Sequence, residues 1–385
     1  MGPEPSSTGR ANTRHPGRGS RAAGRLEILR KALWNRLKGG ARRPPLEPQR
    51  VLIAHHLLLG DTLMLTALLA KLREQYPEAE VVMAVPEALA PLYQGRPYGV
   101  LAQPWNPRQP LASPLFAGTG FDLALIPGDN RFSWLAQALG ARWIVAFAGD
   151  RPAYKSWPVD QLLPYAEVPA AWADMMAGLV PGAAPRPYAP SAWPAPTAWP
   201  FARPPGRFVV LHVGASTALK RWPPTCWWIL ARQIEAAGLV PVWSAGRGEE
   251  SLVAAADPEG RFQSYAGRLD LAQMWHLIGG AQALISPDTG VAHLGRIVGT
   301  PTVTLFGPGS AVLCGAGAFW RDSKYLAVWV DPFPCRDQQQ LFKRAIPWVR
   351  RCARTTGECP RPLCLEAIAP DRVRAALGEL GVLNI

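Results

Sequence analysis

A cluster of residues able to hold a phosphate group follows a short apolar run in the second half of the chain. Asp288, Thr289 and Gly290 come directly after it, and His293 lies about one turn further along a segment with helical periodicity. Thr289 and Gly290 would place backbone N–H groups at the positive end of a helix dipole, with little side-chain bulk to block an anion. The pattern alone also fits a plain Asp288 N-cap and an ordinary surface or core histidine.

The elements around this cluster predict a strand, helix, strand unit. The strands are residues 283–285 and 302–306, and the helix between them ends near Val298. The string D-T-G-x-x-H, followed at a fixed distance by P-T-V-x-L-F-G-P, resembles the signature of glycosyltransferase family 9, the ADP-heptose:lipopolysaccharide heptosyltransferases. The resemblance implies an α/β protein of GT-B architecture, in which two Rossmann-like domains face each other across a cleft. It also implies ADP-heptose as donor and a lipopolysaccharide core as acceptor.

Asp61 is the candidate general base. Gly60-Asp61 precedes a helical segment, so the simplest interpretation of Asp61 is an N-cap. The sequence around it, G-D-x-L-x-x-x-A-L-L, resembles the N-terminal motif of the family, and the resemblance implies that this aspartate is the base. A carboxylate can take the proton of an acceptor hydroxyl as a glycosidic bond forms. His55 and His56 are the alternative bases.

A second group of candidates lies in the loops that would bind the donor. The segment Gly214-Ala215-Ser216, followed by K-R-W-P at Lys220, resembles the family segment that contacts the donor diphosphate. A lysine there would stabilise the charge that develops on a departing nucleoside diphosphate. The resemblance further implies that Glu249 contacts the ribose and that Leu269 lies in the loop lining the base. Without the resemblance, Lys220 is a solvated cation and Glu249 a favourable acidic residue in a first helical turn.

The wider pattern predicts two domains. Strands, a Gly-bearing loop and helices alternate from Arg50 onward, which indicates a mainly parallel sheet in residues 50–180. Nine prolines in residues 181–205 predict an interdomain linker, because no regular element survives that density of proline. A second Rossmann-like domain follows in residues 206–385. In the GT-B resemblance, the first domain holds the acceptor and the second the nucleotide-sugar.

The N-terminal 49 residues form a basic tail. Residues 1–50 contain 12 Lys and Arg against 3 Asp and Glu, so most of the net charge of +13 lies there. Residues 1–24 are predicted to be disordered. From Arg25 to Lys38, five apolar residues fall on one helical face among basic ones, namely Leu26, Leu29, Leu33, Trp34 and Leu37. Such a helix suits an anionic membrane surface, although docking on the protein itself or a basic arm for nucleic acid would give the same pattern. No nucleic-acid motif supports the last option.

Composition favours a cytoplasmic enzyme without a metal. No apolar run is long enough to span a membrane, and the N-terminus has no hydrophobic signal core. Six cysteines are too few for a disulfide scaffold in a chain of this length. The last four are spaced x16, x6 and x4, without the close pairs typical of zinc sites, so they are interpreted as reduced thiols. No D-x-D motif occurs that would bridge a diphosphate through a metal.

Two departures from the family pattern bear on the substrate. Gly309-Ser310 replace a Thr and a Pro that are common after the last motif, and Arg296 replaces a small residue. These departures bear on the sugar and the acceptor more than on the fold. The resemblance as a whole implies an inverting heptosyltransferase, which we expect to be metal-independent. The alternatives are a hexosyl or N-acetylhexosaminyl transferase, a GT-B-type nucleotide-sugar epimerase, and a non-catalytic nucleotide-sugar binding protein. The absence of G-x-G-x-x-G after the first strand disfavours a Rossmann dehydrogenase.

Overall fold

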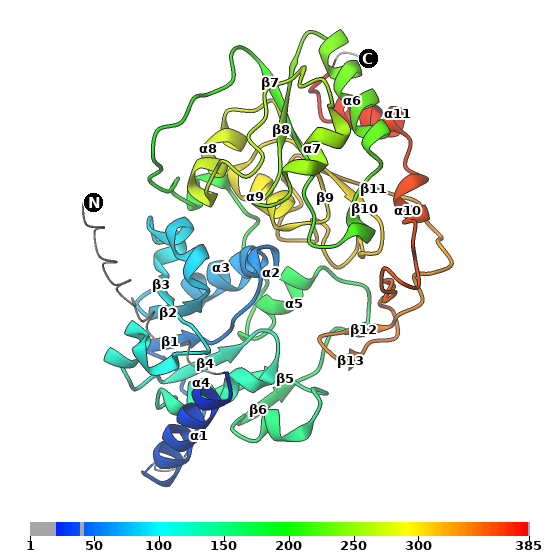
Figure 1. Ribbon diagram of the computed structural model, residues 1–385. Coiled ribbons are helices and arrows are strands. Elements are labelled where there is room, and N and C mark those ends of the chain that lie inside the picture. The colour runs from blue at the N-terminus through cyan, green and yellow to red at the C-terminus, as the bar shows by residue number, and fades with distance from the viewer. Residues whose placement is uncertain (1–20, 39–41, 384–385) are drawn as a thin grey trace, which may run out of the picture.

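Two parallel β-sheets, one in each half of the chain, organise the computed structural model, which describes residues 21–38 and 42–383 (Figure 1). The described residues of the first half form a sheet of order β3-β2-β1-β4-β5-β6. Its strands are β1 (Arg50–Ile53), β2 (Glu80–Val85), β3 (Leu101–Pro104), β4 (Leu123–Ile126), β5 (Trp143–Phe147) and β6 (Gln161–Leu163). The order, with its reversal next to β1, is that of a Rossmann-like domain, as predicted. The pattern did not predict β6.

The second sheet has the order β11-β10-β9-β7-β8, and its strands also pair in parallel. The strands are β7 (Phe208–His212), β8 (Val240–Ser244), β9 (Ala283–Pro287), β10 (Thr302–Phe306) and β11 (Tyr325–Trp329). Every residue of β7, β9 and β10 is buried, as expected for parallel strands covered on both faces. The strand β11 falls in a region that the sequence pattern left irregular.

Helices of the first half pack around the first sheet. They are α2 (Leu59–Met64), α3 (Thr66–Gln75), the 3-10 helix η1 (Glu87–Tyr93), α4 (Ser133–Ala138) and α5 (Trp172–Ala177). The sequence predicts one helix from Asp61 to Tyr76, whereas the chain forms α2 and α3 with a junction at Leu65. The buried residues of both helices contribute to the same core.

Helices of the second half surround the second sheet. They are α6 (Pro224–Ala236), α7 (Glu250–Ala256), α8 (Leu271–Gly279), α9 (Gly290–Val298), α10 (Leu363–Glu366) and α11 (Pro370–Glu379). The helix α8 begins with a capping box between Asp270 and Gln273, and α9 ends at Gly299, whose φ of 84° favours glycine. The proline-rich stretch contains one short 3-10 turn, Pro190–Ala192, among its described residues.

A hairpin from the second half reaches the first domain. Strands β12 (Gln340–Leu341) and β13 (Arg344–Ala345) pair antiparallel and lie beside β5 and α5 in Figure 1. The buried Arg344 donates from Nε to the carbonyl of Ala148 at 2.8 Å and from Nη2 to Oδ1 of Asn130 at 2.7 Å. Trp348 donates to the carbonyl of Ala166 at 2.8 Å. The hairpin therefore forms a second connection between the domains, on one side of the space between them.

The predicted basic helix is present as α1 (Arg21–Lys38), and it docks on α4. Ile28 and Ala32 are buried in a cluster beneath the first sheet, and Asn35 donates to the carbonyl of Ala138 at 2.8 Å. The predicted apolar face is turned away from this contact, since Leu33 is 51% and Leu37 84% exposed. The helix α1 therefore docks on the first domain through one face and leaves its predicted apolar face exposed, although docking and membrane contact were predicted as alternatives. The predicted disorder of residues 1–24 lies largely outside the described residues.

None of the helices in the described ranges combines the length and the hydropathy needed to cross a membrane.

Candidate functional site

A hollow of about 740 Å³ lies between the two domains. The first domain contributes the start of α2, and the second contributes the loops that follow β7, β8, β9 and β10. These loops stand at the carboxyl ends of parallel strands, where open α/β sheets bind ligands. The hairpin segment closes part of the hollow with Leu341, Phe342, Arg351 and Arg354.

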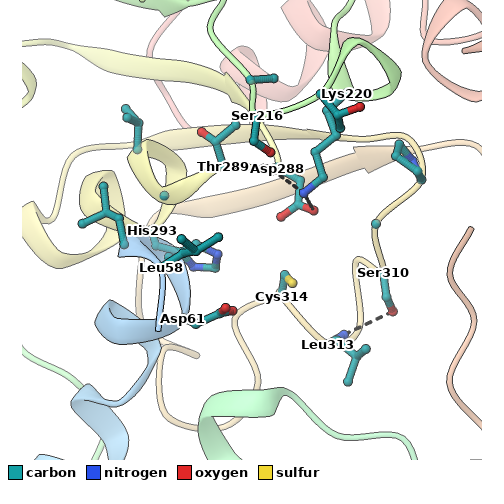
Figure 2. A pocket seen from close by; sticks show the side chains of 18 of the residues that line it. Leu58, Asp61, Ser216, Lys220, Asp288, Thr289, His293, Ser310, Leu313 and Cys314 are labelled. Carbon is teal, nitrogen blue, oxygen red and sulfur yellow. Dashed lines mark hydrogen bonds and ion pairs between the residues drawn. The ribbon is translucent and has the colours of Figure 1, made fainter. Parts of the chain in front are cut away.

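Asp61 faces this hollow from the first turn of α2 (Figure 2). The predicted N-cap role is wrong, because α2 begins at Leu59 and its N-cap position is Leu58. Within the described part of the chain, the carboxylate makes no hydrogen bond or ion pair. Burial, together with the charge of Asp288, raises the pKa of Asp61 to about 6, although Lys220 and Arg351 oppose the rise. A carboxylate with that pKa can accept a proton near neutral pH.

The alternative bases are placed less well. His55 is buried, its Nδ1 accepts a hydrogen bond from the Leu57 amide at 3.1 Å, and burial lowers the pKa of the imidazole to about 3. Neither His55 nor His56 belongs to the described residues that line the hollow. Asp61 is therefore the better placed candidate.

Lys220 and Asp288 form an ion pair across the hollow from Asp61 (Figure 2). The Lys220 Nζ lies 2.9 Å from Oδ2 of Asp288 and 2.8 Å from its backbone carbonyl. Burial opposes the charge on Lys220, but the adjacent Asp288 raises the pKa of the lysine, which stays protonated. Because α9 begins at Gly290 with Thr289 as its cap, the prediction of Asp288 as the cap residue is wrong. Its side chain fixes the lysine instead.

The N-terminus of α9 opens on the hollow with few side-chain atoms. Thr289 makes no side-chain cap, and its Oγ1 lies 3.1 Å from the Ser286 hydroxyl. A Cβ on Gly290 would lie 2.7 Å from Cγ of Leu59 on α2, so only glycine allows α2 and α9 to approach this closely. The first amides of α9 have no intrahelical partner, which makes this end favourable for an anion.

His293 lies near this end of α9 and is held by the unusual Arg296. The Arg296 guanidinium donates to Nδ1 of His293 and to the carbonyls of Cys314 at 2.9 Å and Gly315 at 2.7 Å. Burial and the nearby Arg296 and Lys220 lower the pKa of His293, so its imidazole is neutral. Because Nδ1 accepts, the proton is assigned to Nε2, which is then a donor. The departure at Arg296 therefore positions a predicted site residue.

The predicted donor loops line the hollow from the second domain. Gly214, Ala215 and Ser216 line the hollow, and Glu249 links their loop to the next one. The Glu249 carboxylate accepts hydrogen bonds from the amides of Ala215 at 3.0 Å and Gly246 at 2.9 Å. Leu269 is not among the described lining residues and packs, partly buried, against the core.

Arg351 is a cation of the site that sequence reasoning missed. It lines the hollow, and its charge acts on both Asp61 and Lys220. Its buried Nε has no hydrogen-bond partner among residues 21–38 and 42–383. Residues 336–361 contain seven Lys and Arg, and nothing in the sequence distinguishes Arg351 from the other basic residues there.

One group of possible metal ligands is compact within the described ranges. The ligand atoms of Asp288, His293 and Cys314 all lie within 4.8 Å of one another. Lys220 already pairs with Asp288, and Arg296 already donates to His293. A divalent cation there would meet two fixed positive charges.

Comparisons with known proteins identify relatives of this chain. Residues 182–345 match the model of glycosyltransferase family 9 (heptosyltransferase). A lipopolysaccharide heptosyltransferase 1 from Pseudomonas aeruginosa is 30% identical over 172 residues, which cover 44% of this chain and 46% of that relative. The matched part thus spans about half the length of the curated relative.

Solved structures extend the likeness of fold to both domains. A family 9 glycosyltransferase from Veillonella parvula superposes with a TM-score of 0.66 at 16% identity, covering 88% of this chain and 98% of that one. The E. coli ADP-heptose lipopolysaccharide heptosyltransferase II superposes with a TM-score of 0.63 at 18% identity, covering 86% of this chain and 98% of that one. The E. coli heptosyltransferase WaaC, solved with ADP, superposes with a TM-score of 0.61 at 16% identity, covering 86% of this chain and 98% of that one.

The two parallel sheets and the hollow between them are the GT-B architecture, as predicted. The predicted resemblance to glycosyltransferase family 9 is confirmed, and residues 182–345 carry the match to that family.

Proposed function

We propose that this chain is a glycosyltransferase that moves heptose from ADP-heptose to a lipopolysaccharide core acceptor. The observation that carries the proposal is an Asp61 carboxylate to which no described residue donates a hydrogen bond. It faces the Lys220–Asp288 pair and the N-terminus of α9 across one hollow. The donor and acceptor are taken from the relatives, one named a lipopolysaccharide heptosyltransferase and another solved with ADP. Residues 50–180 would hold the acceptor, residues 206–385 the donor, and residues 181–205 would link them.

The geometry supports an inverting displacement. The Asp61 carboxylate takes the proton of the acceptor hydroxyl, whose oxygen forms a bond to the anomeric carbon. The bond from that carbon to the diphosphate breaks on the opposite face, and its electron pair leaves with the nucleoside diphosphate. Lys220 and the first amides of α9 stabilise the negative charge of the leaving group. The rest of the donor site would be lined by two groups of residues. One lies in the loops after β7 and β8, namely Gly214, Ala215, Ser216 and Glu249, and the other lies at the start of α9, namely Thr289, Gly290 and His293.

The reaction is proposed to need no metal ion. The charges of Lys220 and Arg351 already act on Asp61, and Arg296 donates a hydrogen bond to His293. Fixed cations of this kind replace the charge that a bridging metal would provide at a diphosphate.

A panel of nucleotides tests the donor assignment. ADP and ADP-heptose should raise the melting temperature by several degrees, because a ligand at about 100 times its Kd stabilises the folded state by about 2.7 kcal/mol. UDP and UDP-sugars at the same concentration should have a much smaller effect. Preference for UDP compounds would move the function to hexosyl or N-acetylhexosaminyl transfer, and no response to any nucleotide would contradict the donor site.

We further propose that α1 holds the protein at an anionic membrane surface, where a lipid-linked acceptor would be found. The exposed apolar side chains form one face, and basic residues flank it, namely Arg25, Arg30, Lys31, Arg36 and Lys38. Apolar burial combined with attraction to anionic lipid is the usual basis of such binding.

Substitution at this face tests the membrane proposal. Leu33→Ser with Leu37→Ser should weaken binding to phosphatidylglycerol vesicles by at least about tenfold, because each buried leucine contributes roughly 1.5–3 kcal/mol. Deletion of the tail would be a poor test, since Ile28 and Ala32 belong to a core cluster. The control is Leu46→Ser with Leu111→Ser, two exposed leucines outside α1. Equal sedimentation of both double variants with vesicles would refute the membrane role.

A further inference from the structure

Four of the six cysteines line one small cavity in the second domain, away from the candidate base. The cavity has a volume of about 140 Å³, and its lining includes Cys335, Cys352, Cys359 and Cys364. Their spacing in the sequence did not predict this, because the hairpin of β12 and β13 separates the first from the second. The fold brings them together because the two ends of the hairpin segment, near Gln338 and Arg351, pair with each other.

The pairing of the two hairpin legs explains how they meet. Gln338 and Arg351 exchange backbone hydrogen bonds of 2.9 and 3.2 Å, so Cys335 and Cys352 lie at the base of the same ladder. Both cysteines line the cavity. Cys364, on α10, and Cys359, just before it, complete the ring around the cavity.

The segment that carries these thiols has little regular structure to hold it. Between β11 and α10, the described chain forms only the two residues of β12 and the two of β13. The tip is anchored by the buried side chains of Leu341, Ile346 and Val349. The base, residues 351–362, contains no helix or strand, and most of its residues are exposed or only partly buried. Segments too small for a core of their own are commonly fixed by a disulfide or a metal ion.

Charged side chains line the cavity beside the thiols. They are Glu358 and two arginines that each pair with a carboxylate, Arg354 with Asp337 and Arg361 with Glu366. Arg354 lines it, and its Nη1 lies 3.9 Å from Sγ of Cys352. Arg361 lines it as well. A metal ion binds cysteine as thiolate, and the nearby guanidinium groups would offset part of that negative charge.

We propose that Cys335, Cys352, Cys359 and Cys364 bind one thiophilic metal ion, Zn²⁺ or iron, in a structural tetrathiolate site. No three of these sulfur atoms lie within 4.8 Å of one another among the described side chains, so binding would draw them inward to the spacing of about 3.8 Å that metal–sulfur bonds of about 2.3 Å require. The inference does not depend on the proposed transfer reaction.

The site also has a consequence for the hollow between the domains. The Cys352 amide donates to the carbonyl of Pro308 at 2.9 Å, and Cys352 lines both the small cavity and the larger hollow. Its neighbour in the chain is Arg351. A metal at the four cysteines would therefore fix the loop that presents Arg351 to Asp61.

The test is the metal content of the full chain, purified under reducing conditions without a chelator and measured by inductively coupled plasma mass spectrometry. About one zinc or iron per chain is expected, and Cys359→Ser should lose most of it. Cys359 is only partly buried, so the serine variant is expected to fold. Cobalt-loaded wild type should show a sulfur-to-cobalt charge-transfer band that Cys359→Ser lacks.

Two matched controls locate the ion. Cys226→Ser removes a thiol outside the cavity, and Cys314→Ser removes the thiol of the group near Asp288. Both variants should retain the metal. Loss of metal from Cys314→Ser with retention in Cys359→Ser would overturn the proposal. So would a reduced wild-type chain that contains no metal and takes up neither added zinc nor added iron, or a Cys335–Cys352 disulfide in place of free thiols.

Discussion

Asp61→Asn is expected to lower the turnover number by about 10²–10⁴-fold, the usual contribution of a general base, while the affinity for nucleoside diphosphate changes little. The amide keeps the size of the carboxylate but cannot take the proton of the acceptor hydroxyl. Asp61 lies on α2, across the hollow from the donor loops, and makes no hydrogen bond to another described residue. Its replacement therefore breaks no contact on which folding depends.

The measurements are steady-state release of nucleoside diphosphate and calorimetric binding of ADP. Asp322→Asn, at an exposed aspartate, is the matched control and should behave as wild type. Turnover by Asp61→Asn within a factor of three of wild type would show that the carboxylate is not the base.

The pH dependence gives an independent check on the same residue. The raised pKa of Asp61, about 6, means that the carboxyl is increasingly protonated as the pH falls through 6, and a protonated carboxyl cannot act as base. The value of kcat/KM for wild type should therefore decrease below about pH 6 and level off above it. This acid limb should be missing from the residual activity of Asp61→Asn.

Lys220→Ala is expected to lower kcat/KM by about 10²–10³-fold, because it removes a cation from the leaving group. Asp288 is 6% exposed, and without Lys220 its carboxylate would lose its ion-pair partner beside the donor diphosphate. The variant thus loses the attraction between Lys220 and the diphosphate and gains a repulsion between Asp288 and the diphosphate. Binding of ADP should weaken as well, in contrast to Asp61→Asn.

A second substitution separates the charge effect from a folding defect. In Lys220→Ala with Asp288→Asn, the uncompensated carboxylate is gone, so part of the lost ADP affinity should return. Lys324→Ala, at an exposed lysine, is the control. Undiminished ADP binding by Lys220→Ala would mean that Lys220 only holds Asp288 in place.

Much of the fold could be predicted from local pattern. Buried parallel strands such as β7 and β10 are short runs rich in apolar and β-branched residues, and the proposed donor residues Gly214, Ala215 and Ser216 follow β7. The roles of Asp61 and Asp288 as caps were predicted wrongly, because the N-cap of α2 lies three residues before Asp61 and that of α9 one residue after Asp288. Capping depends on backbone geometry within a single residue, which periodicity does not resolve.

The rest of the site depends on contacts between distant segments. The charge of Arg351 acts on Asp61 because the hairpin crosses to the first domain, where Arg344 donates a hydrogen bond to Asn130. Arg296 looked like a departure from the family, yet it holds His293 and the Cys314 loop. The same hairpin brings the four cysteines together, because the chain leaves the second domain after Cys335 and returns to it at Cys352. No property of the single residues indicates such partners.

The most direct test of the account is the release of ADP from ADP-heptose with and without a heptose-deficient lipopolysaccharide core acceptor. The account predicts release that depends on the acceptor, accompanied by stoichiometric transfer of the sugar and abolished in Asp61→Asn. Turnover of ADP-heptose at the same rate without acceptor would indicate an epimerase or hydrolase. Binding of ADP-heptose without any turnover would contradict the assignment of Asp61 as a catalytic base.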